Sequence, residues 1–199
     1  MTPKTVILDF GNVVAFFDHR RACRQLASLS GRGSDEDDVF REVFETSLEH
    51  DVDAGVIPPD RFIDILRGRF WLDGTDDQIR TAWCDIFTPN EAMAALIPRL
   101  KQDGLRLVLA SNTNPLHFDW IAREFFALLS HFDALVLSHQ VGARKPDARF
   151  FAQCRDASHA EAGECLYVDD RSDFVDVARG MGMKGVVYRP DVDLGAVTG

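Results

Sequence analysis

Four short apolar runs, each leading into polar residues, constrain the fold of this chain more than any other feature of its sequence. The first run, residues 6–8, ends directly at Asp9. The other three are residues 107–110, followed by Ser111 and Asn112; residues 134–137, before a loop that reaches Lys145; and residues 166–168, followed by Asp169 and Asp170. Apolar runs of this length that alternate with helical segments are typical of buried parallel strands. The sequence therefore predicts an α/β protein with a Rossmann-like parallel sheet sandwiched by helices.

The polar residues should meet at one edge of that sheet, because the carboxyl ends of parallel strands open into a common crevice where ligands bind. Taken singly, these side chains are ordinary. An Asp after a strand is usually a turn residue or a helix cap, and Ser-Asn-Thr-Asn is common cap and turn chemistry. Taken together, two acidic clusters, a hydroxyl and a lysine form a set that folding alone does not require. The pattern indicates a site for a cation and a phosphate group.

The order of these motifs resembles that of the haloacid dehalogenase-like superfamily of aspartate-nucleophile phosphohydrolases. The resemblance spans nearly the whole chain and rests on residues 9–13, 111–114, 144–147 and 168–170. Within the superfamily, these motifs are most similar to those of small bacterial sugar-phosphate phosphatases of the alpha-D-glucose-1-phosphate phosphatase type. The resemblance implies an α/β core with an inserted small helical cap.

The resemblance also assigns a nucleophile and a metal site. It implies that Asp9 attacks phosphorus and forms an aspartyl-phosphate intermediate, which is the covalent strategy open to a carboxylate. Mg²⁺ prefers octahedral oxygen ligands and keeps several waters, so it needs few protein groups. Asp9, the backbone carbonyl of Gly11 and Asp170 would supply them. Asp169 would orient the metal shell and its waters.

Phosphate binding is assigned in the same way. A phosphate monoester is dianionic and repels a carboxylate, so a metal ion and cationic or hydrogen-bonding groups must neutralise it first. The resemblance implies that Ser111 and the amide of Asn112 hold phosphate oxygens. Lys145 would present a compact charge to both the phosphoryl group and Asp9.

Two positions depart from the superfamily pattern. Most of its phosphatases carry a second Asp two residues after the nucleophile, as an acid for the leaving group and a base for water, but this chain has Gly11. A positioned general acid or base contributes roughly 10²- to 10⁴-fold. The sugar-phosphatase branch also carries Gly here, which favours a substitute donor, and Asp18 is the candidate catalytic residue, with His19 beside it. Asp18 also reads as the N-cap of the following helix, and we weigh that alternative more heavily. Phe174 stands where an Asn or Asp often follows the acidic pair, which removes an outer metal contact.

Composition limits the partners of the chain. A net charge of -10 and a pI near 5.0 disfavour nucleic acid, whose binding depends on clustered basic residues. No apolar run approaches the ~20 residues needed to span a bilayer, and no basic-then-apolar leader precedes the first strand. Four widely spaced cysteines without a CxxC pair suggest reduced core thiols. We therefore expect a cytoplasmic protein, monomeric or homodimeric, that acts on a small phosphorylated metabolite.

A helical insertion separates the first and second strands. Helix starts are predicted at residues 34–37, 58–60 and 75–78, the last as a capping box. Residues 17–88 therefore predict a cap domain, and residues 1–16 and 89–199 the α/β core. A closing cap would select the substrate. Its candidate contacts are Glu49, His50 and Trp71, but we favour structural roles, a surface helix for the first two and a core anchor for Trp71. The same two alternatives stay open for His117 and His139.

Three functions remain open on these residues. The leading one is a Mg²⁺-dependent phosphatase for a small metabolite such as a sugar phosphate. The second is a dehalogenase, which uses an equivalent aspartate and also lacks the second Asp. Asp169 and Asp170 argue against it, because a metal-free mechanism gains nothing from two buried acids that repel each other. The third is a non-catalytic binding module, suggested by Gly11 and Phe174.

Overall fold

The structure is a computed structural model that describes residues 2–195 of the chain. These residues form two compact units. The first, here called the sheet unit, contains the residues up to Phe16, Thr88–Asn112, and those from Phe125 onward. The second, here called the helical unit, contains Phe17–Phe87 and Thr113–Glu124. None of the helices in the described part of the chain combines the length and the apolar character that crossing a membrane requires.

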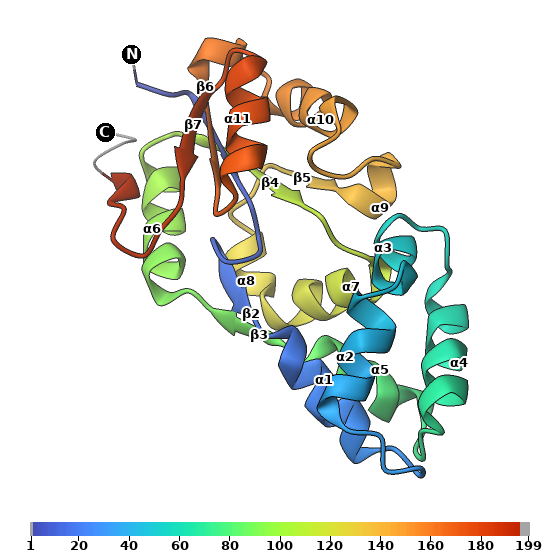
Figure 1. Cartoon of the computed structure of the whole chain (residues 1–199). Coiled ribbons are helices and arrows are strands. Elements are labelled where there is room, and N and C mark those ends of the chain that lie inside the picture. Colours follow the sequence, from blue (N-terminus) through green and yellow to red (C-terminus); the bar gives the residue numbers. More distant parts are fainter. Residues whose placement is uncertain (1, 196–199) are drawn as a thin grey trace. The chain divides into compact units, whose positions relative to one another are not determined.

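Five parallel strands form the sheet of the first unit, in the spatial order β5-β4-β1-β6-β7 (Figure 1). Their bounds are β1 Thr5–Leu8, β4 Arg106–Ser111, β5 Ala134–Leu137, β6 Cys165–Asp169 and β7 Lys184–Val187. Each predicted apolar run lies in one of them, so the α/β prediction is confirmed. The central strand β1 is buried along its whole length, as expected for a strand covered on both faces.

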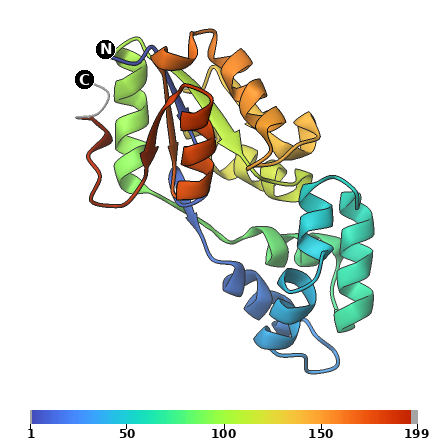
Figure 2. The ribbon, with the colours of Figure 1, turned by 45° about the horizontal axis from the view of Figure 1, so that its top comes forward.

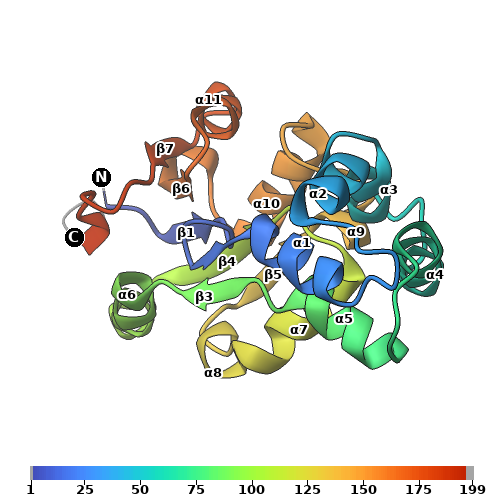
Figure 3. The same ribbon diagram turned by 60° about the horizontal axis from the view of Figure 1, so that its bottom comes forward.

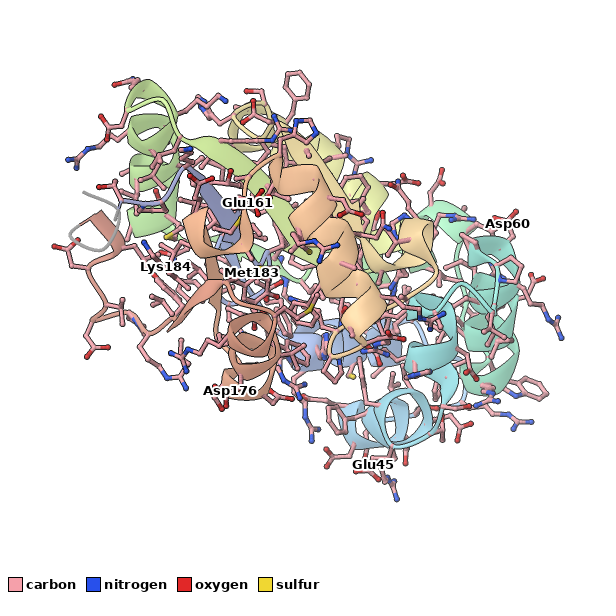
Figure 4. The ribbon with its side chains drawn as sticks, turned by 90° about the horizontal axis from the view of Figure 1, so that it is seen from above. Glu45, Asp60, Glu161, Asp176, Met183 and Lys184 are labelled. Atoms are coloured by element: carbon pink, nitrogen blue, oxygen red, sulfur yellow. The ribbon has the colours of Figure 1, made fainter. Side chains whose placement is uncertain are left out.

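Helices cover both faces of this sheet. Their bounds are α6 Glu91–Gln102, α8 Phe126–Leu129, α9 Ser138–Val141, α10 Ala148–Ser158 and α11 Ser172–Gly180, with a short 3₁₀ turn at Ala162–Glu164. Figure 3 shows α10 and α11 on one side of the strands and α6 and α8 on the other, and Figure 2 shows the strands between α6 and α11. In Figure 4, Asp176 marks α11 and Lys184 marks the start of β7.

Side-chain alternation assigns each strand residue to one face. Ile7 of β1 and Tyr167 of β6 are register partners, and both pack in the core formed with Phe150 and Phe151 of α10 and Val175 of α11. Residues two positions further along a strand point the same way. The side chains two residues after Ile7 and Tyr167 therefore lie at the edge of the sheet, on the face that α10 and α11 cover.

The helical unit contains six helices among its described residues. They are α1 His19–Ser28, α2 Glu36–Phe44, α3 Leu48–Asp53, α4 Pro59–Phe70, α5 Asp76–Cys84 and α7 Pro115–Glu124. The three predicted helix starts correspond to α2, α4 and α5, and the capping box between Thr75 and Gln78 forms as expected. Trp83 of α5 is 1% exposed and packs against Phe44 and Phe62 in the core of this unit.

Two features of the helical unit differ from the sequence-based picture. Trp71, considered as a core anchor, is 54% exposed. It ends α4 in the left-handed conformation, and the Arg32 guanidinium lies over its ring at 3.4 Å. Helix α7, which the sequence places in the core domain, groups instead with the helical unit, because the His117 ring stacks on Trp83 at 5.0 Å. A short strand pair, β2 Ala15–Phe17 and β3 Phe87–Pro89, lies where the chain passes between the units. That the helical unit acts as a cap stays a prediction.

Candidate active site

The register of the central strands brings Asp9 and Asp169 together. Leu8 of β1 pairs with Val168 of β6, and the Asp9 amide donates to the Val168 carbonyl at 2.9 Å. One step further, Asp9 therefore lies opposite Asp169. Both side chains share the face of Ile7 and Tyr167, and both are buried. Two neighbouring parallel strands thus deliver two carboxylates to one point at the carboxyl edge of the sheet.

The Lys145 ammonium lies between these two acids. Its Nζ donates to Asp9 Oδ1 and to Asp169 Oδ2, each at 2.7 Å, and to the backbone carbonyl of Ala110 at 3.1 Å. The side chain is 1% exposed. An ammonium has three N–H donors, and all three are used. Charged hydrogen bonds of this length in a buried site hold the ammonium firmly.

Burial and charge shift the ionisation of this group. Burial raises the pKa of the Asp9 carboxyl to about 7, with Asp169 adding to the rise and the Lys145 charge opposing it. Burial alone would lower the pKa of Lys145, but the carboxylates of Asp9 and Asp169 outweigh it, so the pKa of this ammonium is raised. Lys145 is therefore charged at neutral pH, and a positive charge is held next to the candidate nucleophile.

Asp169 is fully buried and its oxygens are occupied. Oδ2 accepts from Lys145 and from the Tyr167 hydroxyl at 2.9 Å, while Oδ1 accepts from the Arg171 amide at 3.0 Å. Burial, with the charge of Asp169 adding to it, raises the pKa of the Tyr167 phenol well above its usual value, so it donates as a neutral hydroxyl. These contacts suit Asp169 to orienting other groups.

Asp9, Asp169 and Asp170 form a cluster that could hold a metal ion, with one oxygen of each within 4.8 Å of the others. Within residues 2–195, the donors that contact Asp9 reach its Oδ1 and the Asn12 amide reaches Oδ2 of Asp170, which leaves Asp9 Oδ2 and Asp170 Oδ1 as candidate ligands for a cation. When all three carboxylates are ionised, they and the Lys145 ammonium together carry a net charge of two negative units. A hard divalent cation fits this all-oxygen set. Gly11 lies in the turn directly after β1, where its carbonyl is a further candidate.

Asn12 supports this cluster and was missed in the sequence. Its Nδ2 donates to Asp170 Oδ2 at 3.0 Å, across 158 residues of sequence. Its backbone has φ 57°, a left-handed conformation that asparagine tolerates better than most residues. In the sequence, the position of Asn12 next to Gly11 was the signal for a role at the site, because its pairing with Asp170 depends on the sheet register.

Ser111 and Asn112 lie at the end of β4, beside β1. Ser111 is buried and is the last residue of the strand. The Asn112 side chain turns to the Lys145 loop: its Oδ1 accepts from the Lys145 amide at 2.8 Å, and its Nδ2 donates to the Lys145 carbonyl at 3.1 Å. Phe174, a departure noted above, is buried with its ring centroid 5.2 Å from the Lys145 ammonium. Of the expected phosphate-binding residues, Asn112 is therefore joined directly to Lys145, and Ser111 precedes Asn112 at the end of β4.

Asp18 and His19, proposed as substitute proton donors, belong to the helical unit. Asp18 occupies the N-cap position of α1, but its carboxylate makes no capping hydrogen bond and pairs with Arg24 at 2.8 Å. Partial burial would raise the pKa of Asp18, but the contact with Arg24 outweighs it and keeps this pKa below its usual value. Burial lowers the pKa of His19, which stacks on Phe44. Both shifts favour the deprotonated form, which can accept a proton from water but must itself be protonated before it donates one, and the catalytic role of both residues stays a prediction.

The remaining histidine candidates differ in their surroundings. His50 is exposed, and His139 lies on the short helix α9 of the sheet unit. His117 is buried in the helical unit, where its Nδ1 lies 3.2 Å from Asn114 Nδ2 and its Nε2 lies 3.4 Å from the Trp83 carbonyl. Asn114 also donates to Asp53 at 2.8 Å. Because an amide nitrogen only donates, Nδ1 is the acceptor and Nε2 carries the proton. His117 thus belongs to a buried structural network.

Comparison with known proteins places this chain in a family. A family model described as haloacid dehalogenase-like hydrolase matches residues 3–182. A D-ribitol-5-phosphate phosphatase of Bacteroides thetaiotaomicron is 27% identical over 197 residues, covering 94% of this chain and 92% of the relative. A sesquiterpene phosphatase of Aspergillus oryzae is 27% identical over 188 residues, covering 93% and 89%.

A solved structure resembles this chain in fold. A HAD family enzyme from Bacteroides thetaiotaomicron, crystallised with magnesium and inorganic phosphate, matches with a TM-score of 0.82 at 21% identity and 98% coverage of both chains. The resemblance to the alpha-D-glucose-1-phosphate phosphatase type stays a prediction. With the parallel sheet, the acids at its edge and the matched family model together, the chain belongs to the haloacid dehalogenase-like hydrolase family.

Proposed function

We propose that this chain is a Mg²⁺-dependent phosphatase that hydrolyses a small phosphorylated metabolite, such as a sugar or polyol phosphate, through an aspartyl-phosphate on Asp9. The observation that carries the proposal is the Lys145 ammonium held between Asp9 and Asp169, beside a cluster of acids suited to a divalent cation. The named phosphatases among its relatives support the reaction, and the ribitol phosphate of one relative supports the substrate class.

The first chemical step is displacement at phosphorus. An oxygen of the Asp9 carboxylate forms a bond to phosphorus, the ester P–O bond breaks, and the leaving alkoxide takes up a proton. Lys145 lowers the repulsion between the carboxylate and the dianionic phosphoryl group. Ser111 and the backbone amide of Asn112 hold its oxygens. Mg²⁺, held by Asp9, Asp170 and the Gly11 carbonyl, would supply further charge neutralisation when bound.

The second step releases the phosphate. Water attacks the phosphorus of the acyl phosphate, gives up a proton, and restores the Asp9 carboxylate with inorganic phosphate as product. The usual acid and base for these proton transfers is missing at Gly11. We propose that Asp18 or His19 substitutes for it.

A panel of phosphomonoesters, with and without Mg²⁺, tests the function. We expect hydrolysis of one class of small phosphate ester, dependent on Mg²⁺ and lost in Asp9→Asn. Acid quenching during turnover should trap a phosphoryl group that hydroxylamine releases, as an acyl phosphate requires. Halide release from 2-haloacids without Mg²⁺ would instead establish the dehalogenase. Phosphate binding without turnover of any ester would establish the binding module.

A further inference from the structure

The side chain of Asn112 pairs with the backbone of Lys145 at two points. The Lys145 amide donates to Oδ1 at 2.8 Å, and Nδ2 donates to the Lys145 carbonyl at 3.1 Å. A carboxamide offers one acceptor and two donors on a rigid plane, so it can satisfy both backbone groups of one residue. Other side chains cannot do this. An aspartate lacks the donor, a leucine lacks both donor and acceptor, and a serine is too short to reach both backbone groups.

Two backbone hydrogen bonds form local turns in the loop that carries Lys145. The Gly142 amide donates to the Ser138 carbonyl, and the Asp147 amide donates to the Arg144 carbonyl. Both bonds stay within the loop and do not locate it against the sheet. The Asn112 pair comes from the end of β4, the strand beside β1. It therefore relates the Lys145 backbone to the strand edge that carries Asp9.

The location of this backbone decides where the ammonium lies. Lysine has a flexible four-carbon stem, yet its Nζ must reach Asp9, Asp169 and Ala110 at once. N–H···O hydrogen bonds in proteins span about 2.7–3.2 Å between donor and acceptor, so a small shift of the Lys145 Cα lengthens or misaligns at least one of the three. A misplacement of about 1 Å in a catalytic group can cost ~10²-fold in rate.

We propose that Asn112 is a positioning residue, whose side chain fixes the Lys145 backbone so that the ammonium lies between Asp9 and Asp169. Its side chain does not hold the phosphate. This inference rests on the proposed function for its kinetic consequence, but the pairing itself can be measured without turnover.

Hydrogen exchange measures the pairing directly. In Asn112→Leu and Asn112→Ala, the Lys145 amide loses its acceptor, and we expect its exchange to become about 5- to 10-fold faster, which is the equivalent of one net hydrogen bond. Exchange in β1 should be unchanged if the sheet stays folded. Unchanged exchange at Lys145 in both folded variants would overturn the inference.

A double-mutant cycle measures the consequence for catalysis. We expect Asn112→Leu to lower kcat by roughly 10- to 100-fold and to change KM by less than about threefold. Combined with Lys145→Met, it should cost nothing further, because the group that it positions is already absent. As a matched control, Lys101→Met removes an exposed lysine paired with Asp133, and its effect should multiply with that of Asn112→Leu.

The outcomes separate the two proposals. Multiplicative losses for Asn112→Leu and Lys145→Met would show that Asn112 acts on its own, or only on stability, and would overturn the positioning role. Turnover that survives both Asp9→Asn and Lys145→Met would instead overturn the proposed function. The exchange result at Lys145 would then still decide the pairing.

Discussion

His117 should make the helical unit sensitive to acid. Its side chain is 7% exposed, and burial lowers its pKa to about 4, with the nearby Asp53 carboxylate opposing the shift. An unfolded chain binds a proton at this histidine below about pH 6.5. The folded chain does not bind it until about pH 4. Unfolding therefore takes up a proton between these values, and the free energy of unfolding falls as the pH is lowered.

The size of the effect follows from the two pKa values. Between pH 7.5 and pH 5, linkage gives a loss of about 2 kcal/mol from this residue alone. His117→Phe keeps the ring stack on Trp83 but cannot bind a proton. It removes an acceptor for Asn114, which costs about 1 kcal/mol at both pH values and cancels in the comparison. We therefore expect the variant to lose about 2 kcal/mol less than the wild type over this range.

Tryptophan fluorescence during urea unfolding is a suitable assay, because Trp71, Trp83 and Trp120 are the three tryptophans of the chain and all belong to the helical unit. Ile79→Val is the matched control. It trims a buried residue of the same unit and should cost about 1 kcal/mol equally at both pH values. Equal acid-induced losses in wild type and His117→Phe would refute the argument.

Three further predictions concern the active site. Asp9→Asn should abolish turnover and leave the thermal midpoint near that of the wild type, and wild-type rates would remove Asp9 from the mechanism. Asp170→Ala should weaken Mg²⁺ binding at least ~10-fold in calorimetry, because Asp170 lies in the acidic cluster. Asp18→Ala, outside that cluster, should leave Mg²⁺ binding unchanged, and equal affinities in the two variants would contradict the assignment. Because Gly11 supplies no acid, rates should depend steeply on leaving-group pKa in an Asp18→Ala, His19→Ala double variant and shallowly in the wild type. Equally steep slopes in both would show that neither residue donates.

The parallel sheet could be predicted because its information is local. Each strand is a short apolar run, and the acids, Ser111 and Asn112 lie at the end of a strand or directly after it, whereas Lys145 lies in the loop that follows β5. The pairings at the site are different, since Asn12 and Asp170 are 158 positions apart and Asn112 and Lys145 are 33 apart. Only the strand order and register bring them together, and neither can be read from the runs themselves.

Local signals also explain two differences between the sequence-based picture and the helical unit. Trp71 is large and apolar, which favours a core position, but α4 ends there in a left-handed residue that turns the ring outward. Helix α7 has a clear start at Pro115, yet nothing near it in sequence reveals that His117 stacks on Trp83. Packing partners of a helix depend on distant residues, so its start can be predicted more easily than the unit to which it belongs.

The saturation of Lys145 makes ligand entry a competition. Since all three N–H groups of the ammonium are occupied, an incoming phosphate oxygen can bind it only by displacing or sharing an existing partner. The Ala110 carbonyl, at 3.1 Å, is uncharged and is the most distant of the three. A dianionic phosphoryl group can replace a neutral carbonyl with a net gain in electrostatic energy, whereas a sugar hydroxyl or an amide cannot. On the proposed function, the buried lysine would thus discriminate against uncharged ligands before any chemistry begins.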